Sequence, residues 1–396
     1  MSDQRTAQPA ATDPAAPARV ECHSCGRQVP QGTFCGVCGA RLGEPSRSGV
    51  VRRDAFAAHP NERVVALWLV SALLPHLPHR RQPAFRLALA LVVVLLALFG
   101  LLGLNAPAIA FAAAAVPFLY FIYLWEVEVY EDRPLRVAGL LLLGGIVLGA
   151  LWAHFTGHLV TSALIQQVVT GVQASTVLEY GVLIAIGQQI VMLVPAVAVL
   201  LLFRHRFDEA LDGFTFGAAG ALGFAFASTL VDLAPLAQTG QISIVDPLVN
   251  LAQVVQRGFL VPVIDATTTG LIAAAIWLLR GSRRPAVAHL TTSLPVAASM
   301  AVVAQILVPL VGTLTSRVWI QGLVSLAVTL ALIVVVRIAL HHLLLAEAAQ
   351  VGVEGPPFTC PHCRHLVPRL AFCPNCGVAV RATSKRGPGR TGRQVR

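Results

Sequence analysis

The sequence predicts an all-α polytopic membrane protein with about eight transmembrane helices and a small four-cysteine zinc ribbon at each end. Of its 396 residues, 56% are hydrophobic and only 12% are charged, a balance typical of chains embedded in a bilayer. All eight cysteines lie outside the apolar block, four near each end. These observations divide the chain into a central membrane region and soluble modules at its ends.

The predicted organisation has seven segments. They are a disordered leader (1–20), an N-terminal ribbon (21–42), a linker with an interfacial amphipathic helix (43–83), the membrane domain (84–345), a second linker (346–357), a C-terminal ribbon (358–380) and a basic disordered tail (381–396). The leader has no apolar core, so we expect no cleaved signal peptide. The apolar stretch Val64–Leu74 is too short to cross a bilayer and has basic flanks, which predicts a helix at the membrane surface.

The cysteines form two copies of one spacing, in which two Cys-x-x-Cys pairs are separated by nine residues. The copies align without a gap and consist of Cys22, Cys25, Cys35 and Cys38, and of Cys360, Cys363, Cys373 and Cys376. Such pairs can place four thiolates around zinc, and modules of about twenty residues need a metal to fold. We therefore predict two structural zinc ions. The alternative, two disulfides per cluster, is disfavoured in the cytosol.

Eight apolar stretches are each long enough to cross a hydrocarbon core of about 30 Å. They are residues 84–105, 106–125, 135–157, 177–203, 210–236, 253–279, 286–312 and 318–345. An even number of crossings puts both termini on one side. Arginines gather in the loops on that side, whereas the opposite loops carry only Arg317, so the positive-inside rule places both termini and both ribbons in the cytosol. Because the ribbons share a compartment and repeat one another, they could also pack together as a double ribbon, which the sequence leaves open.

Polar side chains interrupt the apolar stretches at similar depths. At about 1.5 Å per residue, Gln188, Ser228 and Asp265 all lie roughly 12–20 Å below the outer ends of their helices, which predicts a shared pocket. Amides at the depth of hydrocarbon are expensive and mark a bundle interior or a site. The other interpretation is structural, with interhelical hydrogen bonds between helices brought close by glycine and alanine.

Three sequence landmarks carry a resemblance to a known family. They are the acidic segment Tyr123–Pro134, the run Phe207–Gly213, and the small-residue stretch Gly217–Ala225. In this order they resemble the PrsW family of intramembrane peptidases, over about residues 85–280. The resemblance implies an active site built from a Glu-Glu-x-x-Lys motif, a Phe-x-x-x-Glu motif and a later histidine.

Every one of these functional positions has changed in this chain. The substitutes are Gln188 and Gln189 for the glutamate pair, Met192 near the lysine position, Ser228 in Phe224-x-x-x-Ser228, and Asp265 where the histidine is expected. A glutamine amide cannot act as a base and is a poor zinc ligand, but it keeps the size and hydrogen-bonding ability of glutamate. The pocket could therefore persist without its chemistry.

The function we predict is that of a non-catalytic binding or scaffold protein of the bacterial inner membrane. Its ribbons would contact a cytosolic protein partner, and its helix bundle could receive a membrane-protein partner. One alternative is an active peptidase with a rearranged site that uses Asp232 and Asp265. Another is a small-solute carrier in which the buried polar residues line a path.

Several other polar residues receive structural interpretations. His154 and His158 lie one helical turn apart and could share a metal, but two ligands are too few, so we expect an interfacial pair. We expect Arg257 and Arg337 to snorkel or to pair within the bundle. Asp212 lies at the start of its helix, where it could cap the helix or interact favourably with the positive end of the helix dipole. The tail at 381–396 is basic, yet its glycines and prolines are typical of a solvated end, so nucleic acid is not an expected partner.

Overall fold

The computed structural model describes most of the membrane region and both ribbons. The described residues are 18–23, 26–43, 83–127, 135–170, 177–203, 207, 210–238, 247–280, 294–315, 317–350, 356–360, 363–378 and 380. The predicted surface helix at Val64–Leu74, most of the predicted leader and the basic tail lie outside these residues.

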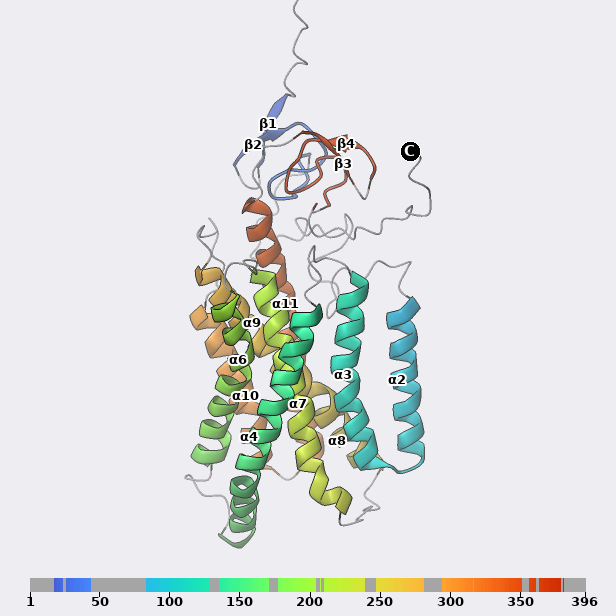
Figure 1. Cartoon of the computed structure of the whole chain (residues 1–396), viewed down its shortest axis with the longest axis vertical. Helices are drawn as coiled ribbons and strands as arrows, with labels where there is room; N and C mark the ends of the chain where they lie inside the picture. The colour runs from blue at the N-terminus through green and yellow to red at the C-terminus, as the bar shows by residue number, and fades with distance from the viewer. Residues whose placement is uncertain are drawn as a thin grey trace, which may run out of the picture.

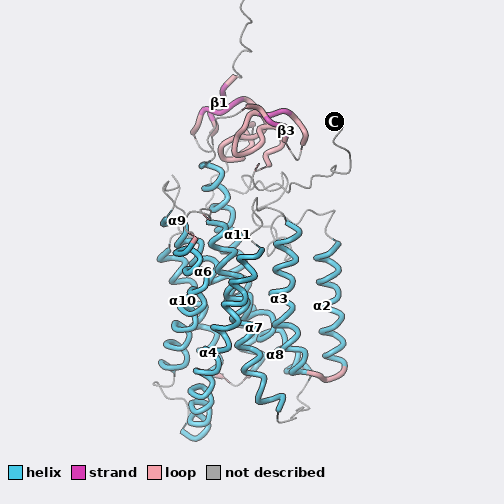
Figure 2. The backbone as a smooth tube through the Cα atoms, in the orientation of Figure 1, coloured by secondary structure: helices cyan, strands magenta, loops and turns pink. Residues whose placement is uncertain are grey.

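Long helices make up the membrane region and run roughly side by side (Figures 1 and 2). In chain order they are α2 (Pro83–Leu101), α3 (Asn105–Val127), α4 (Leu135–Thr170), η1 (Val177–Leu183) with α6 (Ile184–Leu202), α7 (Ala210–Gln238), α8 (Pro247–Val255) with η2 (Gln256–Leu260) and α9 (Val261–Arg280), α10 (Leu294–Leu314) and α11 (Val318–Gln350). Among the described residues, eight segments are long and apolar enough to cross a membrane. The prediction of eight spans is confirmed.

Some helices extend beyond the predicted spans. The apolar span in α4 is Leu135–Gly157, as predicted, and the helix itself continues to Thr170. Helix α11 continues to Gln350, past the predicted end at 345. Helix α10 is described from Leu294, and residues 286–293 of its predicted span lie outside the described residues. The length of an apolar stretch predicts where a helix crosses the bilayer. It does not predict how far polar residues continue the same helix into the interfacial region.

Helices α7 and α9 form the interior of the bundle. About two thirds of the apolar window in each is buried (67% and 72%), compared with 39% or less in the other six. The outer helices instead present large apolar side chains such as Leu91, Leu151 and Leu323, as expected for a surface that contacts lipid. Whatever site the membrane domain holds therefore depends on how α7 and α9 meet their neighbours.

Glycines allow α4 and α7 to approach backbone to backbone. A Cβ atom added at Gly145 would clash with the carbonyl oxygen of Gly220, and one at Gly223 would clash with that of Leu142. Without a hydrophobic driving force between helices in lipid, such close approaches supply van der Waals packing. The small-residue stretch of α7 is thus explained by its packing against α4.

Aromatic contacts fix one end of α7 against α9. The indole Nε1 of Trp277 donates a 3.0 Å hydrogen bond to the carbonyl of Phe207. Phe216 lies between them, with its ring edge-to-face against that of Phe207 at 5.1 Å and against that of Trp277 at 6.2 Å. The run that begins at Phe207 therefore serves as an anchor where α7 starts.

Each ribbon contains a two-stranded antiparallel sheet. In the N-terminal ribbon, β1 (Arg19–Glu21) pairs with β2 (Gln28–Pro30), and in the C-terminal ribbon, β3 (Phe358–Thr359) pairs with β4 (Leu366–Val367). The ribbon strand therefore begins at Arg19, inside the segment predicted as leader. The sequence repeat is a structural repeat, because Val20 pairs with Val29 as Phe358 pairs with Val367 in the equivalent register.

Candidate functional site

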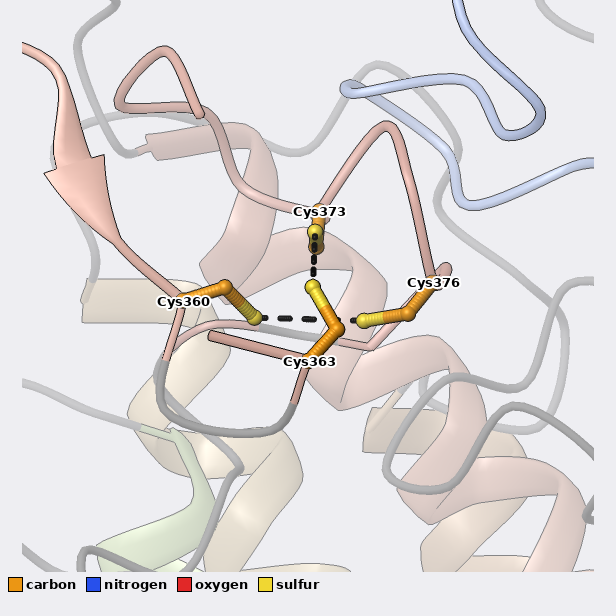
Figure 3. Close-up of side chains that lie close together, drawn as sticks. All are labelled: Cys360, Cys363, Cys373 and Cys376. Atoms are coloured by element: carbon orange, nitrogen blue, oxygen red, sulfur yellow. Dashed lines mark hydrogen bonds between the residues drawn. The ribbon is translucent and has the colours of Figure 1, made fainter. Parts of the chain in front are cut away.

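The C-terminal ribbon gathers four thiols from two knuckles. The sulfur atoms of Cys360 and Cys376 lie 3.8 Å apart, as do those of Cys363 and Cys373 (Figure 3). Four sulfurs around zinc, each about 2.3 Å from the ion, would be about 3.8 Å apart along the edges of the tetrahedron. A disulfide would need about 2.05 Å, so the spacing fits a metal and not a disulfide.

The N-terminal ribbon repeats this arrangement. Cys22, Cys35 and Cys38 form a buried cluster, with 3.7 Å between the sulfurs of Cys22 and Cys38, and Cys25 lies outside the described residues. Interaction with the neighbouring Cys38 thiol lowers the pKa of Cys35 to about 5, which favours the thiolate that zinc requires. In the C-terminal ribbon, burial raises the pKa of Cys376, and nearby Cys360 and Cys373 add to the effect. A divalent cation among the sulfurs would relieve that penalty.

The two ribbons contact each other at the end of the bundle where α11 finishes (Figure 1). The backbone N–H of Phe34 donates to the carbonyl of Pro374 at 2.9 Å, and that of Phe372 donates to the carbonyl of Gly36 at 2.9 Å. This contact requires both ends of the chain to lie on the same side of the membrane. The two ribbons therefore form the double ribbon that the sequence repeat had left open.

Inside the membrane, α9 and α10 share a buried polar contact. The amide Nε2 of Gln305 donates a 2.7 Å hydrogen bond to Oδ1 of Asp265 and lies 3.4 Å from the hydroxyl of Thr268. The exposed fractions are 2% for Asp265, 0% for Thr268 and 6% for Gln305, so water does not reach this contact from the surface. A carboxylate held this way is fixed in place by a neutral donor.

The neighbouring turn of α9 is bound to α6. The amide Nε2 of Gln189 donates a 3.0 Å hydrogen bond to the hydroxyl of Thr269, whose oxygen lies 4.0 Å from the sulfur of Met192. Met192 also packs against Phe224 of α7 in a small buried cluster. Two of the positions singled out in the sequence, Gln189 and Met192, thus contact Thr269, which lies one helical turn after Asp265 on α9.

The remaining positions are arranged differently. Ser228 is half-buried and donates to the carbonyl of Ala225 at 3.1 Å, within its own helix. Gln188 is half-buried beside the fully enclosed Gln189. Neither is joined by a described hydrogen bond to Asp265 or to its partner Gln305. None of the described hydrogen bonds joins Gln188, Ser228 and Asp265 to one another, so their shared pocket stays a prediction.

The two aspartates of the alternative peptidase site, Asp232 and Asp265, lie in different surroundings. Asp232 is exposed on α7 and close enough to the exposed Arg257 for an electrostatic interaction. Asp265 is buried and contacts Gln305 instead. A dyad needs two carboxylates that share one proton, whereas these two aspartates have different surroundings and different partners.

The other predicted polar residues take varied places. His154 is exposed on α4, and the side chain of His158 lies outside the description. Arg337 is buried in α11 at 3% exposure, in keeping with the expected place within the bundle. Asp212 occupies the first turn of α7, where a negative charge interacts favourably with the positive end of the helix dipole.

Sequence reasoning missed Gln305 and the partner role of Thr268 and Thr269. Gln305 lies in the middle of the apolar span of α10, so the depth argument applied to Gln188 and Gln189 would have found it. The threonines lie one turn after Asp265 on the same face of α9. Their pairing with α6 and α10 follows from helix packing, which spacing along the chain does not give.

The chemistry available is limited at the junction of α6, α9 and α10, where Gln189 contacts Thr269 and Gln305 contacts Asp265. Among the described residues, the groups of three or more His, Cys, Asp or Glu side chains that could hold a metal are the two cysteine clusters of the ribbons. At the membrane junction, amides and threonine hydroxyls surround a single carboxylate. Gln189, Met192 and Asp265 do not fit a catalytic zinc, because neutral amides and thioethers are poor zinc ligands.

One comparison with known proteins gives a match. The model of the PrsW family intramembrane metalloproteases matches residues 137–340, just over half of the chain, whereas no curated protein and no solved structure matches. The match begins in α4 and runs into α11, so it lies further along the chain than the resemblance over 85–280, and it leaves out the acidic segment Tyr123–Pro134. The positions that the sequence resemblance assigns to the family's functional residues all fall inside it, at Gln188, Gln189, Met192, Ser228 and Asp265. The chain therefore belongs to the PrsW family of intramembrane metalloproteases.

Proposed function

We propose that this family member is a non-catalytic membrane protein that binds or scaffolds partners. The observation that carries the proposal is the junction of α6, α9 and α10. There, Gln189 stands at a family glutamate position and donates to Thr269, while Asp265 accepts from Gln305. Hydrolysis needs a base or a metal-bound water, and a neutral amide supplies neither.

The junction has a structural role in this proposal. Hydrogen bonds between helices in lipid are each worth roughly 0.6–2 kcal/mol, and this junction joins α9 to helices on two sides. The amides thus retain the architecture of a peptidase pocket in a bundle that no longer cleaves. The partner that we propose for the bundle is a transmembrane segment of another protein.

The ribbons supply the soluble half of the proposed function. Each would hold one structural zinc ion, and both would lie in the cytosol of a bacterial cell, since arginines gather in the loops on their side of the membrane. Leu366 of the C-terminal ribbon is 72% exposed, a large apolar side chain on a very small module. The partner that we propose for the ribbons is a cytosolic protein.

A cleavage assay tests the proposal. The native protein would be reconstituted in liposomes with a single-span membrane reporter tagged at both ends, beside a variant that restores the family pattern (Gln188→Glu, Gln189→Glu, Ser228→Glu and Asp265→His). We expect no cleavage by the native chain, because loss of a general base alone costs about 10² to 10⁴ in rate. Cleavage by the native chain that Asp265→Asn or Asp232→Asn abolishes would overturn the proposal and favour a peptidase with a rearranged site.

A transport measurement separates the third class. Liposomes that carry the native protein would be assayed for uptake of amino acids, sugars and monovalent ions against protein-free liposomes. We expect equal uptake, because the buried amides and Asp265 are engaged with one another rather than with a path. Uptake that Gln305→Leu abolishes would assign the junction to a carrier.

A further inference from the structure

The ribbon-to-ribbon contact has approximate two-fold symmetry in its backbone. A shift of 338 residues relates the ribbons, and it converts the hydrogen bond from Phe34 to Pro374 into the one from Phe372 to Gly36. The internal hydrogen bonds repeat under the same shift, as with Cys35 to Ala40 and Cys373 to Val378. An interface in which each partner uses the same patch is the kind found in symmetric dimers.

Side chains and glycines obey the same relation. A Cβ atom added to Gly377 would lie 2.7 Å from the ring of Phe34. A Cβ atom added to Gly39 would lie 3.0 Å from the ring of Phe372. Phe372 is 2% exposed and Leu370 is 3% exposed. A module of this size cannot bury such side chains within itself, so each ribbon completes the core of the other.

The docking segments are also the metal-binding segments. Cys35 lies between Phe34 and Gly36, and Cys373 lies between Phe372 and Pro374. The backbone groups that cross the interface therefore belong to residues adjacent to sulfur ligands. Metal binding fixes the conformation of such a knuckle, and a fixed knuckle presents its N–H and carbonyl groups to the partner ribbon.

We propose that the two ribbons form a zinc-dependent clasp whose two metal sites are coupled. Each loaded ribbon provides the surface on which the other docks, so loss of zinc from one site loosens the other. The clasp holds the N-terminal ribbon, which precedes the first membrane helix, on the ribbon that follows the last one. This inference rests on zinc as the ion and is independent of whether the membrane domain cleaves a substrate.

A cut in the first linker tests the clasp in the full chain. A site-specific protease sequence would be inserted between Ser48 and Gly49, and an affinity tag placed at the N-terminus. After cleavage of the zinc-loaded protein, we expect the tagged fragment to retain the membrane domain on the affinity resin and to release it when a chelator is added. Loss of the membrane domain while zinc is still bound would overturn the proposal.

Matched glycine variants test whether the observed interface is responsible. A side chain at Gly32 would meet the backbone oxygen of Pro374 at 2.8 Å, whereas one at Gly43, just past the end of the ribbon, would have nothing within 4 Å. Gly32→Val should therefore release the membrane domain after the cut, and Gly43→Val should retain it. Equal retention by the two variants would show that the ribbons do not dock in this way.

Coupling is measured from the opposite ribbon, so that misfolding of the mutated ribbon does not decide the result. Leu370→Asp changes a buried contact to Gly36, and Leu366→Asp changes an exposed leucine of the same ribbon. With both sites loaded, an added chelator should expose Cys22, Cys35 and Cys38 to a thiol label about tenfold faster in Leu370→Asp than in Leu366→Asp, the range typical of coupled contacts. Equal rates would reject the coupling.

Mixing two copies distinguishes a clasp within one chain from one between chains. Tagged and untagged proteins, both carrying the protease site, would be reconstituted together and then cut. We expect the tagged fragment to retain only the membrane domain of its own chain. Capture of the untagged copy's membrane domain in comparable amount would show that the ribbons pair between chains, which contradicts the clasp.

Discussion

At the scale of single residues, the buried contact between Asp265 and Gln305 shows how this bundle tolerates a carboxylate in lipid. The two side chains lie 2.7 Å apart on α9 and α10, and both are almost fully enclosed. Leaving a buried polar group without its partner destabilises the protein by the full desolvation free energy of that group. Replacing both partners by apolar groups can be nearly neutral. This asymmetry makes the pair testable.

We predict that Gln305→Leu lowers the free energy of unfolding by about 1–2 kcal/mol, because it strands the carboxylate of Asp265. The double variant Asp265→Leu and Gln305→Leu should recover most of that loss. Thermal unfolding in detergent measures both, with Gln188→Leu as the control at a half-buried amide. A double variant less stable than Gln305→Leu alone would contradict the predicted pairing.

At the scale of elements, the crossing of α4 and α7 depends on positions where any side chain meets backbone. Gly145 faces the carbonyl oxygen of Gly220, and a polypeptide backbone cannot move aside as a flexible side chain can. The small-residue sequence of α7 is therefore a packing requirement, and overpacking such a contact costs about 1–3 kcal/mol.

We predict that Gly145→Ala lowers the melting temperature of the membrane domain relative to Gly139→Ala. Gly139 lies in the same helix with nothing within 4 Å of its added Cβ atom. Alanine favours helix over glycine by about 1 kcal/mol at both positions, so the difference between the variants isolates the clash. Similar melting temperatures for the two would show that α4 and α7 can separate without loss of stability.

The ribbons make a second prediction at this scale. Cys360→Ser should reduce bound zinc to one ion per chain or fewer, because the four C-terminal thiols form one site. The melting temperature of the membrane domain should stay unchanged, since the thiols lie outside the bundle (Figure 1). Metal content by mass spectrometry and unfolding by fluorescence measure these effects, with His365→Ala as a nearby control that should keep both ions.

At the scale of the whole molecule, the arrangement of the ends constrains the topology. The ribbons touch, so the chain must cross the membrane an even number of times, in agreement with eight spans. The direction of insertion is a separate property, set by the charges in the loops.

We predict that an impermeant thiol reagent added outside the cell labels a cysteine placed at Thr239 and does not label one placed at Ser282. The expected pattern follows from the arginines near Ser282, at Arg280, Arg283 and Arg284, which favour the cytosolic side. Permeabilised cells provide the control, because both positions should then react. Labelling of Ser282→Cys alone in intact cells would invert the topology and place the ribbons outside.

Much of this protein was determined by local features of its sequence. Eight spans follow from apolar length, and the metal-binding spacing follows from the repeated Cys-x-x-Cys pairs. The departure from the family's catalytic residues at Gln189 and Asp265 stays a prediction that the resemblance implies. Each of these depends on residue type or on distance along the chain. The ribbon repeat was also sufficient to suggest that the two modules pair.

Only the tertiary structure decided which of these residues meet. It joined Gln189 to Thr269 and Asp265 to Gln305, left Ser228 bonded to its own helix, and placed Asp232 near Arg257. Depth along a helix is a linear quantity that a sequence provides. The rotation of each helix about its axis, which selects the residues that face one another, is set by side-chain and glycine packing between α4, α7 and α9.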